Sequence, residues 1–118
     1  MKYMVLIYSE TPTTEPNPEL MQQVMAEYGA YGAELDKRKA QVTNEALQGP
    51  ETATTVRVRN GKAKFTDGPF VESKEQIGGF YLIEAKDKTE ALDLAAMCPG
   101  TKYGAVEVRP VIDFSTMR

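Results

Sequence analysis

The sequence predicts an α+β domain in which two helices cover one face of an antiparallel sheet. Three observations support this prediction. The chain opens with a short apolar run typical of a buried strand, two segments carry apolar residues at helical spacing, and Asn60-Gly61 marks a β-hairpin. The expected order is strand, long helix, weak strand, hairpin, strand, short helix and strand. With 118 residues and no internal repeat, we expect a single domain over residues 1–118.

The first strand is expected at residues 3–8, where every side chain is apolar. Because successive side chains point to opposite faces, both faces of this strand are apolar. The two sets are Tyr3, Val5 and Ile7, and Met4, Leu6 and Tyr8. Two helices cover only one face, so the other set needs a second cover. We expect two subunits to stack sheet against sheet in a twofold dimer. The alternative is that loops 9–16 and 66–78 fold over this face.

Two helices follow from capping signals and apolar spacing. The first begins at Asn17, which can cap the helix, and runs to about Lys39. It contains two glycines that we attribute to close packing on the sheet, Gly29 and Gly32. The second opens at the capping-box spacing of residues 87–90 and ends at Pro99-Gly100.

Further strands are expected where short apolar or alternating runs lie between turn signals. These segments are 42–47, 54–59, 62–66, 80–83 and 105–111, with 54–59 showing a half-exposed pattern. In the last strand, Val106 and Val108 alternate with Glu107 and Arg109. If the valines pack under the helices, the two charged side chains point to the opposite face.

The composition excludes several classes of function. The chain has no histidine and one cysteine, which excludes Ser-His-Asp and Cys-His catalysis, a zinc site of four Cys or His ligands and an intrachain disulfide. No metal-ligand spacing or phosphate-binding glycine motif stands out, so we expect no metal and no cofactor. A net charge of −3 argues against nucleic-acid binding. The apolar start is too short for a signal peptide or a membrane span, so we expect a cytoplasmic protein.

The central segment TDGPFVESKEQIGGFY, residues 66–81, resembles the signature of the DGPF family within the YCII-related group. Three other segments resemble the same family, namely residues 1–8, 50–57 and 106–110. The resemblance covers nearly the whole chain. It implies a ferredoxin-like fold of the dimeric α/β-barrel superfamily.

The resemblance implies less about function. The relatives include small-molecule isomerases, cofactor-free monooxygenases and effector-binding domains of transcription regulators. Some YCII-type proteins use a His-Asp pair, which this chain cannot form because it has no histidine. Members of the family are often linked with alternative sigma factors, which suggests a regulatory setting.

The charged residues of the central segment are the first candidates for chemistry. Asp67 and Glu72 are candidate catalytic bases, and Lys74 is a candidate ligand-binding cation. Asp67 could instead accept backbone N–H bonds at the Gly68-Pro69 turn, and the charged segment could be a solvated loop. Glu72 and Lys74 have the same parity in an extended chain and could line one side together.

Three further residues are candidate ligand-binding groups. Glu107 and Arg109 share the sheet face opposite the valines, where the Arg109 guanidinium could bind an anion; the alternative is a structural ion pair. Tyr28, Tyr31 and Tyr81 are amphipathic and are expected in the core with hydroxyls at its boundary, and Tyr81 is the one expected to reach a cleft.

These observations predict a cytoplasmic homodimer that binds a small molecule near the Asp67–Gly79 loop. One hypothesis is an enzyme that transfers a proton through a carboxylate. The alternative is a non-catalytic effector-binding or accessory protein in a transcription-regulatory setting. Neither hypothesis identifies the ligand.

Overall fold

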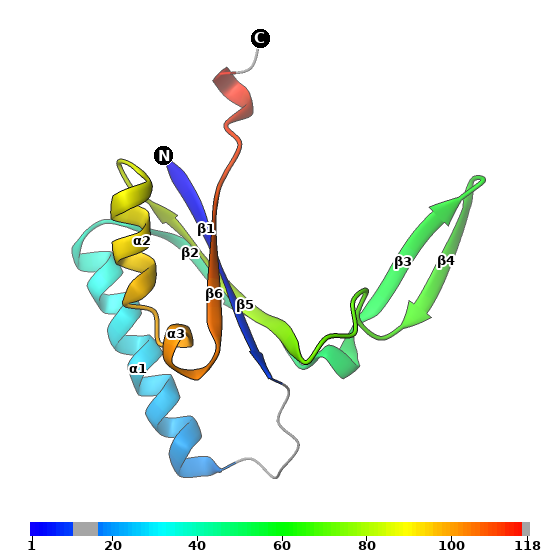
Figure 1. Cartoon of the computed structure of the whole chain (residues 1–118), viewed down its shortest axis with the longest axis horizontal. Coiled ribbons are helices and arrows are strands. Elements are labelled where there is room, and N and C mark those ends of the chain that lie inside the picture. The colour runs from blue at the N-terminus through cyan, green and yellow to red at the C-terminus, as the bar shows by residue number, and fades with distance from the viewer. Residues whose placement is uncertain (11–16, 117–118) are drawn as a thin grey trace.

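Four strands form one antiparallel sheet in the computed structural model, which describes residues 1–10 and 17–116. The strand order is β2-β5-β1-β6. These strands are β1 (Lys2–Glu10), β2 (Gln41–Ala46), β5 (Glu75–Glu84) and β6 (Ala105–Pro110). Helix α1 (Pro18–Lys37) connects β1 to β2, and α2 (Lys88–Ala96) with α3 (Gly100–Tyr103) connects β5 to β6. Both connections lie on one face of the sheet (Figure 1), so the predicted α+β, ferredoxin-like architecture is confirmed.

The core lies between this face and the helices. Tyr3 and Val5 point into it from β1, and Ile83 does so from β5. Leu35 of α1 and Cys98 between α2 and α3 close it from the helix side. Burying each large aliphatic side chain contributes about 1.5–3 kcal/mol, so this layer supplies most of the driving force for folding. Tyr3 and Val5 therefore share one face of the sheet, as predicted, and this is the face that the helices cover.

The helix boundaries follow from their caps. The Asn17 carboxamide oxygen accepts hydrogen bonds from the backbone N–H groups of Glu19 and Leu20, at 3.0 and 3.2 Å. The Asp87 carboxylate accepts the backbone N–H of Glu90 at 2.9 Å. Helix α2 ends at Ala96 rather than at the predicted Pro99-Gly100. These two residues instead lead into the short helix α3, with Pro99 as its N-cap.

The second apolar set forms an open face on the other side of the sheet. The cross-strand register places Met4 opposite Leu82 and Leu6 opposite Phe80. All four side chains are half-buried, as is Tyr8. The helices lie on the other side (Figure 1), so this open face is shielded by its own strand neighbours and not by a helix layer. We use "open face" below for Met4, Leu6, Tyr8, Phe80 and Leu82.

The two loops considered above as an alternative cover for the open face differ in how much of each the structure describes. Most of the first falls on residues 11–16, outside the described residues. The second includes strand residues at both ends, because β5 begins at Glu75 and not at the predicted residue 80. Backbone pairing with Ser9 and Glu10 of β1 extends β5 into this polar segment. The polar side chains do not prevent this, because strand pairing uses backbone hydrogen bonds.

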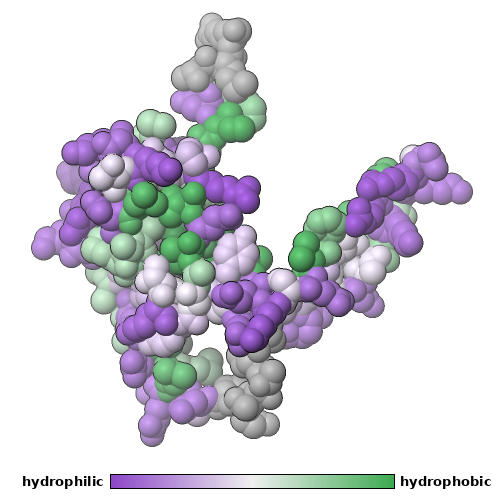
Figure 2. All heavy atoms as spheres, viewed as in Figure 1, coloured by the Kyte–Doolittle hydropathy of each residue, from purple (hydrophilic) through white to green (hydrophobic). Residues whose placement is uncertain are grey.

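The β3–β4 hairpin is the main departure from the prediction. Strands β3 (Thr54–Arg59) and β4 (Lys62–Asp67) meet at Asn60-Gly61, whose φ angles of 53° and 73° suit a two-residue turn. They pair only with each other and project from the body (Figure 1, Figure 2). The radius of gyration is accordingly 16.6 Å, against about 13–14 Å for a compact domain of this length. The predicted half-exposed pattern is wrong, because both faces of the hairpin are largely exposed.

One close backbone contact explains a glycine that the sequence did not single out. A Cβ on Gly104, which precedes β6, would lie 2.1 Å from the carbonyl oxygen of Tyr8. The glycines of α1 behave differently. A Cβ on Gly29 would meet nothing within 4 Å, and one on Gly32 would make an ordinary 3.8 Å contact with the side chain of Gln41. The interpretation that close packing requires Gly29 and Gly32 is therefore wrong.

The close contact at Gly104 predicts that Gly104→Ala and Gly29→Ala change the free energy of unfolding in opposite directions. Gly104→Ala should lower the free energy of unfolding by about 1–3 kcal/mol or more, because the β1–β6 backbone must move apart. Gly29→Ala should raise it by about 1 kcal/mol, because the helix position is open. Urea denaturation of both variants measures these changes. Equal stability of the two variants would contradict the close contact at Gly104.

Candidate functional site

A charged pair borders the open face on strand β6. The Arg109 Nε donates to Glu107 Oε1 at 3.2 Å, and Nη2 donates to Oε2 at 3.4 Å. The register places Arg109 opposite Met4 and Glu107 opposite Leu6, so the charges adjoin apolar side chains. Val106 and Val108 pack against the core on the other face, so the condition considered above for the direction of the two charged side chains is met. The structural ion pair considered above is therefore present.

This ion pair leaves the guanidinium available to a ligand. The Arg109 side chain is 68% exposed, and exposed ion pairs contribute only about 0–1 kcal/mol. A carboxylate or phosphate could therefore compete with Glu107 for the planar guanidinium. The neighbouring open face would contact an apolar portion of the same molecule. The arrangement suits a small molecule with one anionic and one apolar end.

Asp67 lies at the end of β4, opposite Thr54. Backbone atoms hold the turn that follows: Gly68 N–H donates to the carbonyl of Ala53 at 2.8 Å, and Thr55 Oγ1 donates to the carbonyl of Gly68 at 2.9 Å. The alternative role for Asp67, accepting backbone N–H bonds, is not observed. Within the described residues its exposed carboxylate has no hydrogen bond or ion pair, so it is free to contact another molecule.

Glu72 and Lys74 lie in the segment that connects β4 to β5, and both are exposed. Lys74 Nζ lies 3.3 Å from Glu10 Oε1, so the cation pairs with the end of β1 and not with Glu72. The side chain of Gln76 donates to the carbonyl of Val71 at 2.8 Å. This segment is thus tied to the sheet at one end, while the Glu72 carboxylate remains in solvent.

Tyr81 occupies the opposite side of the sheet from Glu107 and Arg109. It is 7% exposed, with its ring centroid 5.0 Å from that of Tyr31 in an edge contact and 6.3 Å from that of Tyr28 in a stacked one. Burial raises the pKa of all three phenols, so they remain protonated at neutral pH. The core assignment of these tyrosines is confirmed. Because the sheet separates them, Tyr81 cannot share one cleft with Arg109.

A second polar cluster, which the sequence did not reveal, ties α1 to α3. Lys102 Nζ and the Tyr103 hydroxyl donate to the two carboxylate oxygens of Glu27. Glu27 and Lys102 border a groove of about 470 Å³, whose lining also includes Tyr31 and Cys98. Glu27 and Lys102 are 75 positions apart, and no motif marks either one. Their charges neutralise each other, so this cluster stabilises the helix packing and offers no free charge.

The thiol of Cys98 is also unsuited to chemistry. It is 1% exposed, and burial raises its pKa above the ordinary thiol value. Cys98 is therefore a packing residue of the core. Among the described residues, no three Cys, Asp or Glu side chains gather into a group that could hold a metal ion.

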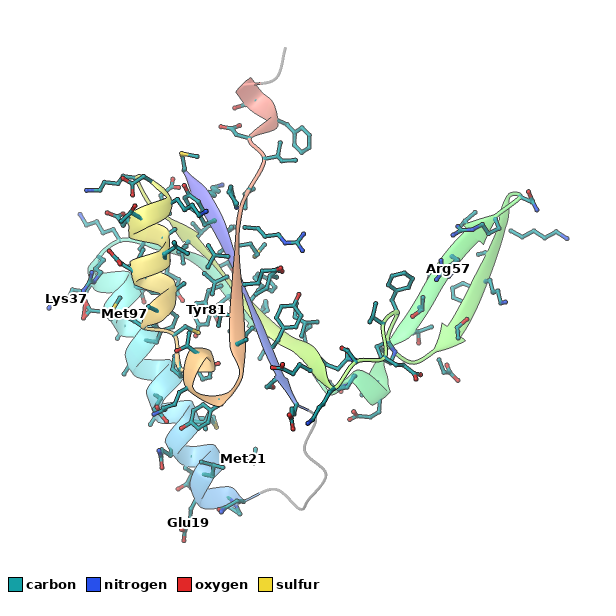
Figure 3. The ribbon with its side chains drawn as sticks, in the orientation of Figure 1. Glu19, Met21, Lys37, Arg57, Tyr81 and Met97 are labelled. Carbon is teal, nitrogen blue, oxygen red and sulfur yellow. The ribbon has the colours of Figure 1, made fainter. Side chains whose placement is uncertain are left out.

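The six candidate residues therefore lie in three places. Glu107 and Arg109 border the open face, and Tyr81 lies in the core behind it. Asp67 ends the hairpin, and Glu72 and Lys74 follow it in the chain. Figure 3 shows how far Arg57, on the hairpin, stands from Tyr81. The open face with its charged border and the base of the hairpin are the two candidate surfaces.

The chain is a ferredoxin-like α+β domain with an added hairpin, and comparisons with known proteins assign it to a family. The YCII-related domain family matches residues 1–115. An uncharacterized protein of Rhizobium meliloti (strain 1021) is 35% identical over 114 residues, which cover 94% of this chain and 92% of that relative. The chain therefore belongs to the YCII-related family. No helix within residues 1–10 and 17–116 is long and apolar enough to cross a membrane.

The Glu27 cluster predicts a pH-dependent contribution to stability. The hydrogen bonds from Lys102 and Tyr103 lower the pKa of the Glu27 carboxyl in the folded state. A lowered pKa stabilises the fold above the carboxyl's ordinary value of 4.5, and this contribution is lost as the pH falls through the folded-state pKa. Glu27→Gln should therefore destabilise the protein at pH 7 and have a smaller effect in acid.

Denaturant unfolding of the wild type and Glu27→Gln between pH 3 and 7 measures this difference. Glu72→Gln is the matched control, because it removes a carboxylate from an exposed segment. A Glu27→Gln effect that stayed constant over this range would show that the ionic contact with Lys102 contributes nothing.

Proposed function

We propose that this YCII-related protein binds a small anionic molecule at the open face, near the Asp67–Gly79 segment. The observation that carries this proposal is the exposed Arg109 guanidinium beside a row of half-buried apolar side chains. Binding sites for small molecules commonly combine an apolar surface with a few polar groups that orient the ligand. Lys74 pairs with Glu10 at the far end of β1, whereas Arg109 lies opposite Met4, so Lys74 is a candidate cation for a separate contact and not for the group that Arg109 binds.

A carboxylate-based proton transfer is the reaction that fits these residues. Asp67 is the preferred base, because its carboxylate has no partner within the described residues. Glu72 is the second candidate. The buried tyrosines keep their protons at neutral pH, so a phenolate base is disfavoured. In such a step the carboxylate would remove a proton from the bound molecule while Arg109 holds its anionic group.

The second candidate function is effector binding without turnover, in a transcription-regulatory setting. One observation favours it: Asp67 and Glu72 are both exposed, whereas catalytic carboxylates commonly lie in clefts that exclude water. Both candidates use the same ligand site. They differ in whether the carboxylates change the bound molecule.

We further propose that the protein is a cytoplasmic homodimer that stacks through its open faces. The open face brings together five apolar side chains from the two central strands, a surface that a second sheet could cover. The buried free Cys98 is compatible with a reducing compartment.

The ligand site is tested with small organic carboxylates and phosphates, screened by thermal shift. Arg109→Gln should weaken binding of a hit by about tenfold or more, because hydrogen bonds to a charged partner contribute about 1.5–3 kcal/mol. Lys86→Gln, which removes an exposed cation from the segment between β5 and α2, is the control and should leave affinity unchanged.

The molecules found in this screen also distinguish the enzyme hypothesis from effector binding without turnover. Under the enzyme hypothesis, Asp67→Asn or Glu72→Gln abolishes conversion while the melting temperature stays nearly constant. Binding that persists in both variants, with no conversion by the wild type, supports effector binding. Equal affinity of the wild type and Arg109→Gln for every hit would contradict the proposed ligand site.

The dimer is tested by sedimentation velocity. Leu6→Glu places a charge at the centre of the open face and should weaken dimerisation at least tenfold. Leu92→Glu is the control, because Leu92 is an exposed residue of α2 in the layer on the other side of the sheet. A wild type that light scattering shows to be monomeric at micromolar concentration would contradict the dimer.

A further inference from the structure

The β3–β4 hairpin has an apolar face and a cationic face, and its apolar face is exposed. Side chains alternate along each strand, so the register separates an apolar row from a cationic row. The apolar row is Val56, Val58, Ala63 and Phe65, and the cationic row is Arg57, Arg59, Lys62 and Lys64. The three large apolar side chains are 56–69% exposed. An isolated two-stranded hairpin is only marginally stable in water, so this row needs a packing partner.

The hairpin carries a concentration of positive charge, which favours a partner with negative charge. Arg57 lies opposite Lys64 and Arg59 lies opposite Lys62, and like charges in directly opposed positions destabilise a strand pair. The Arg57 guanidinium is 4.8 Å from the centroid of the Phe70 ring, which is a cation–π contact and leaves the charge unneutralised.

The rest of the chain has the complementary charge. Residues 54–67 carry four basic residues and one acidic residue, a net charge of +3. Because the whole chain carries −3, the remainder carries −6. A second copy therefore offers the basic hairpin an acidic body, in addition to exposed apolar surface. Charge complementarity thus favours a second copy of this chain as the partner of the hairpin.

The register of the hairpin also determines the face on which the Asp67 side chain lies. Asp67 is the last residue of β4, two and four positions beyond Phe65 and Ala63, so it lies on the same face as the apolar row. Any surface that the apolar row contacts will therefore be close to the free Asp67 carboxylate. Within one chain, by contrast, Arg109 pairs with Glu107, and Asp67 has no charged partner among the described residues.

We propose that the apolar row of the hairpin packs against a second copy of this chain and brings Asp67 of one copy to the Glu107–Arg109 border of the other. The ligand site is then composite, with the guanidinium and apolar surface from one subunit and the carboxylate from its partner. This inference rests on the dimer and the ligand site proposed above, and it adds that neither subunit holds a complete site.

Hydrogen exchange of the wild type tests the docking of the hairpin. Amides of residues 54–67 should exchange at least tenfold more slowly above the dimer dissociation constant than below it, because docking protects an otherwise marginal hairpin. Phe65→Glu should weaken dimerisation at least tenfold. Met25→Glu is the matched control, because Met25 is 71% exposed on α1 and Phe65 is 69% exposed.

The outcomes separate this inference from the proposed dimer. A wild-type dimer whose hairpin exchanges equally fast at both concentrations would overturn the docking and leave the dimer intact. A protein that remains monomeric at every concentration would overturn both. Concentration-dependent protection, lost in the monomeric Leu6→Glu variant, would support both.

Cross-linking tests the composite site. Chains carrying Asp67→Cys are mixed with chains carrying Arg109→Cys and treated with a short bismaleimide, so a link between the two positions can form only between subunits. Asp93→Cys mixed with Arg109→Cys is the control, because Asp93 is an exposed residue of α2 in the helix layer. A much higher yield for the Asp67 pair would support the composite site, and equal yields would overturn it.

Discussion

The central position of β1 organises the rest of the structure. This strand pairs with β5 on one side and β6 on the other, and its side chains are apolar on both faces. Tyr3 and Val5 anchor the helix-covered core, whereas Met4 and Leu6 form the centre of the open face. A single strand thus contributes to the core on one face and leaves a second apolar surface that no helix covers, because consecutive apolar residues in a strand alternate between its faces.

The protein has two kinds of polar group, those buried or paired in the helix layer and those exposed outside it, and the two kinds have different roles. On the helix side, the phenols are buried and protonated, and the charges of Glu27 and Lys102 neutralise each other. On the open side, the Arg109 guanidinium is exposed, and the Asp67 carboxylate is exposed on the hairpin outside the main sheet. Groups of the first kind stabilise packing, whereas the exposed groups can contact another molecule at small cost, because an exposed ion pair such as Glu107–Arg109 contributes little to stability.

Much of the fold could be predicted because local signals agree with it. Asn17 and Asp87 cap the two long helices where expected, and Asn60-Gly61 forms the predicted hairpin turn. The prediction failed where a contact joins distant segments. The backbone of Gly104 approaches Tyr8, and β5 extends by pairing with β1. Such contacts leave no periodic pattern along the chain, because the partner strand decides them.

The sequence by itself determined the fold class, the family resemblance, the two faces of β1 and the absence of histidine, because these depend on residue identity and short-range spacing. Only the tertiary structure decided how the candidate residues group. It placed Tyr81 behind the sheet, paired Lys74 with Glu10, and detached the hairpin that carries Asp67 from the main sheet. The physical reason is that strand pairing and layer packing bring together residues whose separation in sequence exceeds any local pattern.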